Sequence, residues 1–102
     1  MKKMTLVELL KDKGFAAEAY ENVSREHVVL SKTFEKDVEV AWHGTMHSTL
    51  MVRVFVNLES GICHADFCKD GSIRYKDRWY DTIGKRTFNA IADTVKNAGF
   101  EF

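Results

Sequence analysis

Two histidines and two cysteines lie close together in the middle of this sequence. His43 and His47 occur in "WHGTMHSTL", and Cys63 and Cys68 occur in "CHADFC". Two cysteines with two histidines are a common ligand set of structural zinc sites. Whether they bind a metal ion depends on whether the local structure brings the four side chains together.

Strand geometry argues against a shared metal ion. The pattern predicts one strand through Cys63 and Cys68, and residues an odd number of positions apart point to opposite faces of a strand. Their Cα atoms would lie about 16 Å apart, beyond the ~7 Å limit for a disulfide. His64 and Cys68 share a face at about 13 Å, whereas zinc ligands lie about 2 Å from the ion. We expect a buried Cys63, scattered surface histidines, no metal and no disulfide.

The sequence also gives no positive sign of catalysis. Cys63 and His64 are neighbours on the strand and point to opposite faces, so they do not form the nucleophile and base of a thiol enzyme. His64 and Asp66 share a face about 7 Å apart, a spacing typical of the solvated side of a sheet. There is no glycine-rich phosphate loop, no GxSxG and no HExxH motif. We expect no catalytic residue and no cofactor; a deep pocket with His64 and Asp66 in its wall would favour an enzyme.

Size and charge limit the remaining classes of protein. A chain of 102 residues that is 45% hydrophobic is expected to form a single α+β domain, residues 1–102, around one core. Fifteen Lys and Arg balance fifteen Asp and Glu, so no overall field attracts nucleic acid or an anionic membrane. Glu8 interrupts the apolar start of the chain, which excludes a signal peptide or a membrane span there. A cytoplasmic location is the expectation.

Helices are predicted at both ends of the chain. Thr5 and Glu8 form a capping box at the start of the first helix, and "KGF" at 13–15 marks its end; "AAEAYENV" is expected to add a further turn or two. At the other end, apolar residues recur with helical spacing. Asp81 or Thr82 is expected to cap this helix and Gly99 to end it. Its apolar residues are Phe88, Ile91, Ala92 and Val95.

Between the helices the apolar residues alternate with period two, which predicts strands. Short turn signals at 35–37, 60–61 and 69–71 separate them and indicate antiparallel hairpins. The expected strands are 27 to 34, 37 to 43, 49 to 58, 61 to 68 and 72 to 76. A two-residue turn at Ser60-Gly61 would place Cys63 opposite Leu58 and Arg53 opposite Cys68.

The predicted fold class is therefore an α+β two-layer sandwich: an N-terminal helix, an antiparallel β-meander of four to five strands and a C-terminal helix, with both helices packed on one sheet face. Strand 27 to 34 is the expected edge strand. An unpaired edge is a template for association with a second copy, so a monomer and a homodimer both remain open.

Two surfaces are candidates for binding a partner. On the outer sheet face, Met51, His43, Phe55 and Arg53 mix the apolar, aromatic and cationic types that occur at the centres of interfaces. The first helix, a C-terminal extension or a dimer partner could instead cover this patch. The candidate partner-binding residues are Arg53 and Phe55 on that face, and Trp79 and Tyr80 at its edge. We expect a small non-catalytic protein that docks on a protein partner and regulates or inhibits it.

The second candidate is nucleic-acid binding through "RYKDRWYDTIGKR". Basic residues attract phosphates, and the interleaved aromatic rings stack on bases. A helix that opens with cations would also suit a bound phosphate. The candidate nucleic-acid-binding residues are Arg74, Lys76, Arg78, Lys85 and Arg86. The order of elements is similar to that of double-stranded RNA-binding domains, but the likeness is limited to topology and Gly84-Lys85-Arg86, and this chain has more strands.

The two hypotheses predict different behaviour. Nucleic-acid binding should weaken steeply as salt rises and on changing Lys85 and Arg86 to Glu. An apolar docking face should tolerate salt and fail on Phe55→Asp.

Overall fold

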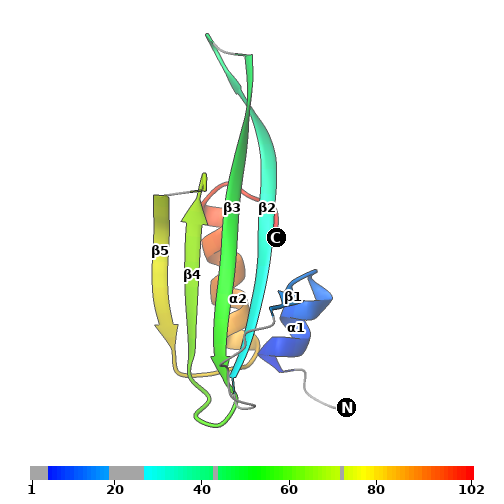
Figure 1. Ribbon diagram of the computed structural model, residues 1–102, viewed down its shortest axis with the longest axis vertical. Helices are drawn as coiled ribbons and strands as arrows, with labels where there is room; N and C mark the ends of the chain where they lie inside the picture. The colour runs from blue at the N-terminus through cyan, green and yellow to red at the C-terminus, as the bar shows by residue number, and fades with distance from the viewer. Residues whose placement is uncertain (1–4, 19–26, 43, 72) are drawn as a thin grey trace.

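The computed structural model describes residues 5–18, 27–42, 44–71 and 73–102 and shows an α+β fold (Figure 1). The elements are α1 (Leu6–Asp12), β1 (Ala16–Ala17), β2 (His27–Val40), β3 (Gly44–Asn57), β4 (Cys63–Lys69), β5 (Ile73–Tyr80) and α2 (Lys85–Asn97). The strands form one antiparallel sheet in the order β1-β2-β3-β4-β5. The predicted fold class is confirmed. Of the described residues, neither helix is long and apolar enough to cross a membrane.

One face of the sheet, which we call the inner face, carries the core. Leucines of α1 and apolar residues of α2 pack on it, so both helices lie on this side, and Figure 1 shows α2 behind the sheet. The opposite side is called the outer face. The fully buried core residues are Leu6, Leu10, Leu30, Leu50, Val52, Val54, Ala65, Phe67, Ile91 and Val95.

The first helix begins and ends where the sequence predicts. Thr5 is the N-cap, and its hydroxyl accepts the backbone N–H of Glu8 at 3.3 Å. Gly14 has φ +93°, a left-handed conformation that favours glycine, and the N–H of Phe15 donates to the carbonyl of Leu10 at 3.0 Å. This ending turns Phe15 into the core.

The predicted extension of this helix is wrong at Ala16 and Ala17. These two residues form β1, which pairs with Leu30 and Ser31 of β2. The rest of the expected extension, from 19 on, lies outside the described residues. The pairing also corrects the prediction that 27 to 34 is a free edge, because β1 covers part of that edge and β5 is the last strand on the other side.

The second helix ends as predicted but starts differently. Gly99 has φ +93°, and the N–H of Phe100 donates to Val95 at 3.2 Å. The N-cap is Gly84, which provides no side-chain cap. The predicted caps Asp81 and Thr82 are therefore wrong.

The physical reason is the position of Thr82. Thr82 lies two residues before Gly84. The hydroxyl of Thr87 donates a hydrogen bond to the carbonyl of Thr82 at 2.7 Å, and the two threonine hydroxyl oxygens also lie 2.7 Å apart. The hydroxyl of Thr87 is thus satisfied although the residue is buried at the base of the helix.

The largest difference from the sequence prediction lies in β2 and β3. Glu35-Lys36-Asp37 is not a turn, and β2 runs through it to Val40. β3 begins at Gly44 and pairs with the whole of β2. Since β4 begins to pair with β3 at Leu50, the pairs from Glu35–Thr49 to Val40–Gly44 form a two-stranded arm that extends beyond the rest of the sheet, as Figure 1 shows. We call 35–40 with 44–49 the arm.

The β3–β4 connection is wider than predicted. The side chain of Asn57 accepts the N–H groups of Glu59 and Ser60 at 3.0 and 3.1 Å, and its carbonyl accepts Gly61 N–H at 3.0 Å. Val56 therefore lies opposite Cys63, a register shifted by two residues from the expected one. A shift of two leaves every side chain on its predicted face.

Candidate functional site

A row of side chains crosses the outer face from β2 to β5. Val29 lies opposite Phe55, Phe55 opposite His64 and His64 opposite Trp79. The rings of Phe55 and His64 stack with centroids 5.7 Å apart, and those of His64 and Trp79 at 4.6 Å. We call Phe55, His64 and Trp79 the ring row.

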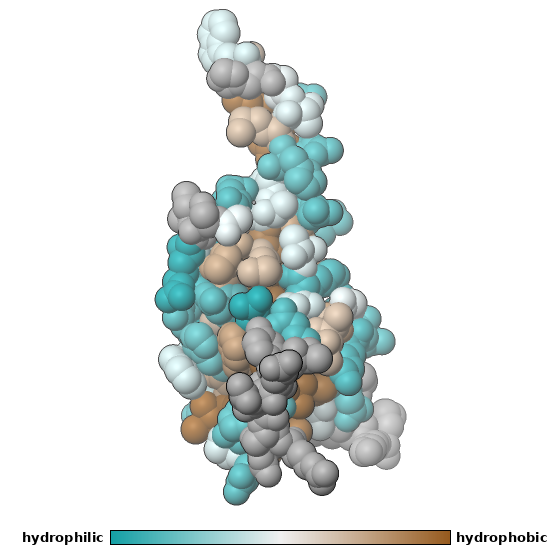
Figure 2. Space-filling model, viewed as in Figure 1, coloured by the Kyte–Doolittle hydropathy of each residue, from teal (hydrophilic) through white to brown (hydrophobic). Residues whose placement is uncertain are grey.

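Trp79 ends the ring row at the edge of the sheet and is 73% exposed. Stacking on His64 fixes the orientation of the indole although most of its surface meets water. In the view of Figure 2 hydrophobic and hydrophilic residues are mixed over the visible part of the sheet. An ordered and exposed tryptophan in such a mixed surface is typical of a binding surface.

A hollow of about 510 Å³ lies beside the ring row. Its wall includes both His64 and Asp66. On sequence grounds, these two residues are evidence for an enzyme if they line a deep pocket. Trp79 and Ile62, which also line it, are exposed, so the hollow is shallow. The lining residues are His27, Phe55, Asn57, Ser60, Ile62, Cys63, His64, Asp66 and Trp79.

Ion pairs lie next to the ring row on the outer face. Arg53 Nε lies 3.3 Å from a carboxylate oxygen of Glu18. Arg74 lies between two carboxylates, 3.5 Å from Asp66 and 3.3 Å from Asp77. Two arginines thus face three carboxylates, one of which also contacts His64, and no large excess of one charge remains on this part of the face.

His64 is also held by Asp77, whose carboxylate oxygen accepts from Nε2 of the imidazole. This contact orients the ring, as a carboxylate does for the imidazole of a general base. A nucleophile would have to come from a neighbouring residue. Cys63 lies on the inner face, and burial raises the pKa of its thiol to about 11, so it stays protonated at neutral pH.

Cys63, Cys68 and His47, the described members of the Cys and His set, do not come together. Cys63 is buried on the inner face and Cys68 lies on the outer face, both as free thiols. His47 lies in the arm, and His43 lies outside the described residues. Within the described part of the chain, no three side chains of metal-ligand type form a group that could hold an ion.

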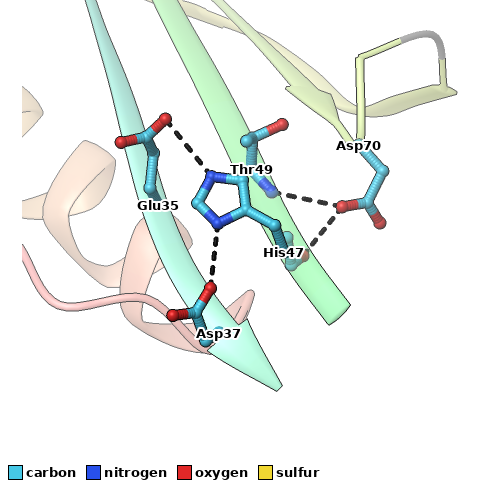
Figure 3. Close-up of polar contacts among 6 residues, drawn as sticks. Glu35, Asp37, His47, Thr49 and Asp70 are labelled. Carbon is cyan, nitrogen blue, oxygen red and sulfur yellow. Dashed lines mark hydrogen bonds and ion pairs between the residues drawn. The ribbon is translucent and has the colours of Figure 1, made fainter. Parts of the chain in front are cut away.

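His47 belongs to a separate polar cluster on the arm (Figure 3). Its Nδ1 lies 3.0 Å from Asp37 and its Nε2 3.3 Å from Glu35, which raises the pKa of the imidazole. Nearby, Asp70 accepts the hydroxyl of Ser48 at 2.7 Å and the N–H of Thr49 at 3.2 Å, and these bonds lower the pKa of its carboxyl. The cluster links β2, β3 and the β4–β5 turn.

The structure brings three of the four predicted partner-binding residues to one face. Arg53, Phe55 and Trp79 share the outer face, and α1 does not cover them because it packs on the inner one. Tyr80 points to the inner face, where it packs against the core and burial raises the pKa of its hydroxyl. The contacts of His64 with Asp77 and Trp79 were missed from the sequence. The predicted last strand ended at residue 76, before both of these residues.

The predicted nucleic-acid-binding residues are divided between two faces. Arg74 lies on the outer face between Asp66 and Asp77. Lys76 and Arg78 lie opposite Phe67 and Ala65 and so belong to the inner-face side of β5. Lys85 and Arg86 are exposed at the start of α2, where the first turn contains no acidic residue.

Comparison with known proteins gives no relative for this arrangement: no protein family, no curated protein and no solved structure matches the chain.

Proposed function

We propose that this protein acts by binding a protein partner through the outer face, around the ring row and Arg53, and that it regulates or inhibits that partner without catalysing a reaction. The observation that carries the proposal is Trp79, which is stacked on His64 and yet 73% exposed. Tryptophan and arginine dominate the energy of protein interfaces. Because the indole is already oriented, its binding costs less side-chain entropy than that of a freely rotating residue.

The remaining features of the face suit the same role. The shallow hollow beside the ring row can receive one side chain of a partner, and the ion pairs around it leave no large excess of one charge. A mixed surface without such an excess and with one aromatic anchor favours protein over phosphate.

The test is affinity capture from a lysate of the native host, comparing the wild type with Trp79→Ser. We expect Trp79→Ser to weaken the specific partner by about thirtyfold or more, the loss typical of an interface tryptophan. Trp42→Ser is the matched control, because Trp42 is 91% exposed and lies between β2 and β3 at the far end of the arm, away from the ring row. Equal capture by Trp79→Ser and the wild type, with both folded by circular dichroism, would contradict the proposal.

Nucleic-acid binding is the alternative, supported by the five exposed cations of β5 and the start of α2. It would be favoured if nuclease removed every captured partner, if Lys85→Glu with Arg86→Glu abolished binding, and if affinity fell steeply with salt. Phe55→Asp should then have little effect, whereas it should abolish docking on the outer face.

Catalysis is supported only by the contact between His64 and Asp77 beside a shallow hollow. The hollow is shallow and Trp79 is exposed beside it, which is why binding is the better proposal.

A further inference from the structure

We propose that the partner adds an extended, acidic segment as a strand along the free edge of β5, an inference that rests on the docking function proposed above. β5 is the last strand of the sheet, and within the described residues no strand lies beyond it. The backbone N–H and C=O groups on that side are therefore available to an added strand.

The side chains of β5 define what the added strand must carry. Lys76 and Arg78 are exposed on its inner-face side, and no carboxylate of the described part of the chain forms an ion pair with either. Acidic residues opposite them would form favourable cross-strand pairs.

The other side of β5 requires an apolar residue. The ring row runs across β3, β4 and β5 and ends at Trp79, and no strand of the described part of the chain lies on the outward side of the indole. An apolar or aromatic side chain on an added strand would lie beside the indole and continue the row. The expected segment thus alternates acidic residues with apolar ones.

The charges of β5 also oppose the simplest competing occupant, a second copy of the same edge. Pairing of two β5 strands would bring Lys76 and Arg78 close to the same residues of the other copy, and like charges in adjacent strands are destabilising. An acidic segment of another protein is the occupant that these charges favour.

The probe is a short synthetic peptide that alternates glutamate with valine, added to ¹⁵N-labelled protein and followed by NMR. We expect shifts at Trp79 and slower hydrogen exchange for the β5 amides that point away from β4, because only strand addition hydrogen-bonds those groups. A peptide of the same composition in shuffled order should bind more weakly and should not protect them.

Matched charge reversals locate the site. Lys76→Glu with Arg78→Glu should weaken the peptide about tenfold or more. Lys85→Glu with Arg86→Glu changes the net charge equally but lies off the strand, so binding should remain within about twofold of the wild type. Equal loss in the two pairs would indicate general attraction to basic charge and would overturn the inference.

Three other outcomes would also overturn it: failure of the alternating peptide to bind, binding without protection of the β5 amides, or self-association of the protein through β5 in sedimentation experiments. The docking function would survive each of these if capture of the native partner still depended on Trp79, since a partner could then lie flat on the outer face.

Discussion

Lys36, on β2, donates a hydrogen bond from Nζ to the backbone carbonyl of Gly99 at 2.8 Å, just beyond the end of α2. The same ammonium lies 4.6 Å from the centre of the Phe100 ring. The last carbonyls of a helix have no partner within the helix and carry partial negative charge. A lysine from the sheet therefore holds the end of α2.

A second lysine of β2 does the same for α1. Lys32 Nζ donates to the carbonyl of Lys13, the C-cap of α1, at 2.6 Å, and lies 4.8 Å from the ring of Phe34. Lys32 and Lys36 are four residues apart and share the inner face of the strand. One strand thus fixes the C-terminal ends of both helices.

Replacement of Lys36 by methionine should destabilise the protein. Methionine keeps the apolar stem but loses the charged hydrogen bond and its interaction with the helix dipole, at a cost of about 1 kcal/mol for a partly exposed group. The measurement is the free energy of unfolding in urea. Lys85→Met is the control: Lys85 lies at the start of α2, where a cation is unfavourable, so its loss should be neutral or slightly stabilising. Equal destabilisation by both variants would show that Gly99 is held by other contacts.

Replacement of Gly99 by alanine should cost more than the same change at Gly61. Both glycines have positive φ, so each alanine pays about 1 to 2 kcal/mol of backbone strain. A Cβ on Gly99 would also lie 2.5 Å from Lys36 Nζ, so the ammonium must move and give up its hydrogen bond to the Gly99 carbonyl, whereas a Cβ on Gly61 meets nothing within 4 Å. The excess destabilisation of Gly99→Ala should disappear when both variants are measured in a Lys36→Met background. An unchanged excess would show that the clash with Lys36 is not its cause.

The helix–sheet–helix order and the inner face were predictable from sequence because both depend on local signals, although β1 was predicted as helix and β2 as two strands. Glycines at 14 and 99 end helices through positive φ, and period-two alternation assigns each strand residue to a face. The β3–β4 register was wrong by two residues, since it depends on how Asn57 folds the connection. The arm was missed because the polar residues Glu35-Lys36-Asp37 were interpreted as a turn. They are polar because this part of β2 extends beyond the main core, and Lys36 reaches from it to the end of α2.

The candidate site was predictable only in part, for reasons of register and strand length. Arg53 and Phe55 could be assigned to the outer face by alternation alone. The stacking of His64 on Trp79 requires the β4–β5 register, which includes an irregularity between Phe67 and Cys68. No local sequence signal gives that register, and the predicted last strand ended before Asp77 and Trp79.

His47 should titrate above its usual range. The imidazole donates hydrogen bonds to the carboxylates of Asp37 and Glu35, the bond to Asp37 having the larger effect, and these raise its pKa above 6.5. Since the pKa is higher in the folded state, the contribution of this cluster to stability is fully present below pH 6.5 and is lost as pH rises through the folded pKa. NMR titration of the imidazole should show a larger decrease in pKa for Asp37→Asn than for Glu35→Gln. Identical values in the wild type and both variants would contradict the contacts.

Cys63 should be unreactive toward thiol reagents in the folded protein. It is 1% exposed, and burial raises its pKa to about 11, so little thiolate forms at pH 8. Brief treatment with iodoacetamide at that pH, followed by peptide mass mapping, should leave Cys63 unmodified, whereas treatment in denaturant should modify it. Cys68, half-buried on the outer face, is the internal comparison and should react first. Rapid modification of Cys63 without denaturant would show that the inner face opens readily.

The arm should exchange its amide hydrogens faster than the rest of the same two strands. Within the described ranges no third strand pairs with it from Glu35–Thr49 to Val40–Gly44, and its apolar residues Val38 and Met46 are exposed. A two-stranded hairpin is only marginally stable in water, whereas residues 50–57 of β3 lie between β2 and β4 over the core. Hydrogen exchange measured by NMR, corrected for intrinsic rates, should therefore be at least about tenfold faster in the arm than in 50–57. Equal protection would mean that the arm is stabilised in solution by contacts that this fold does not itself supply.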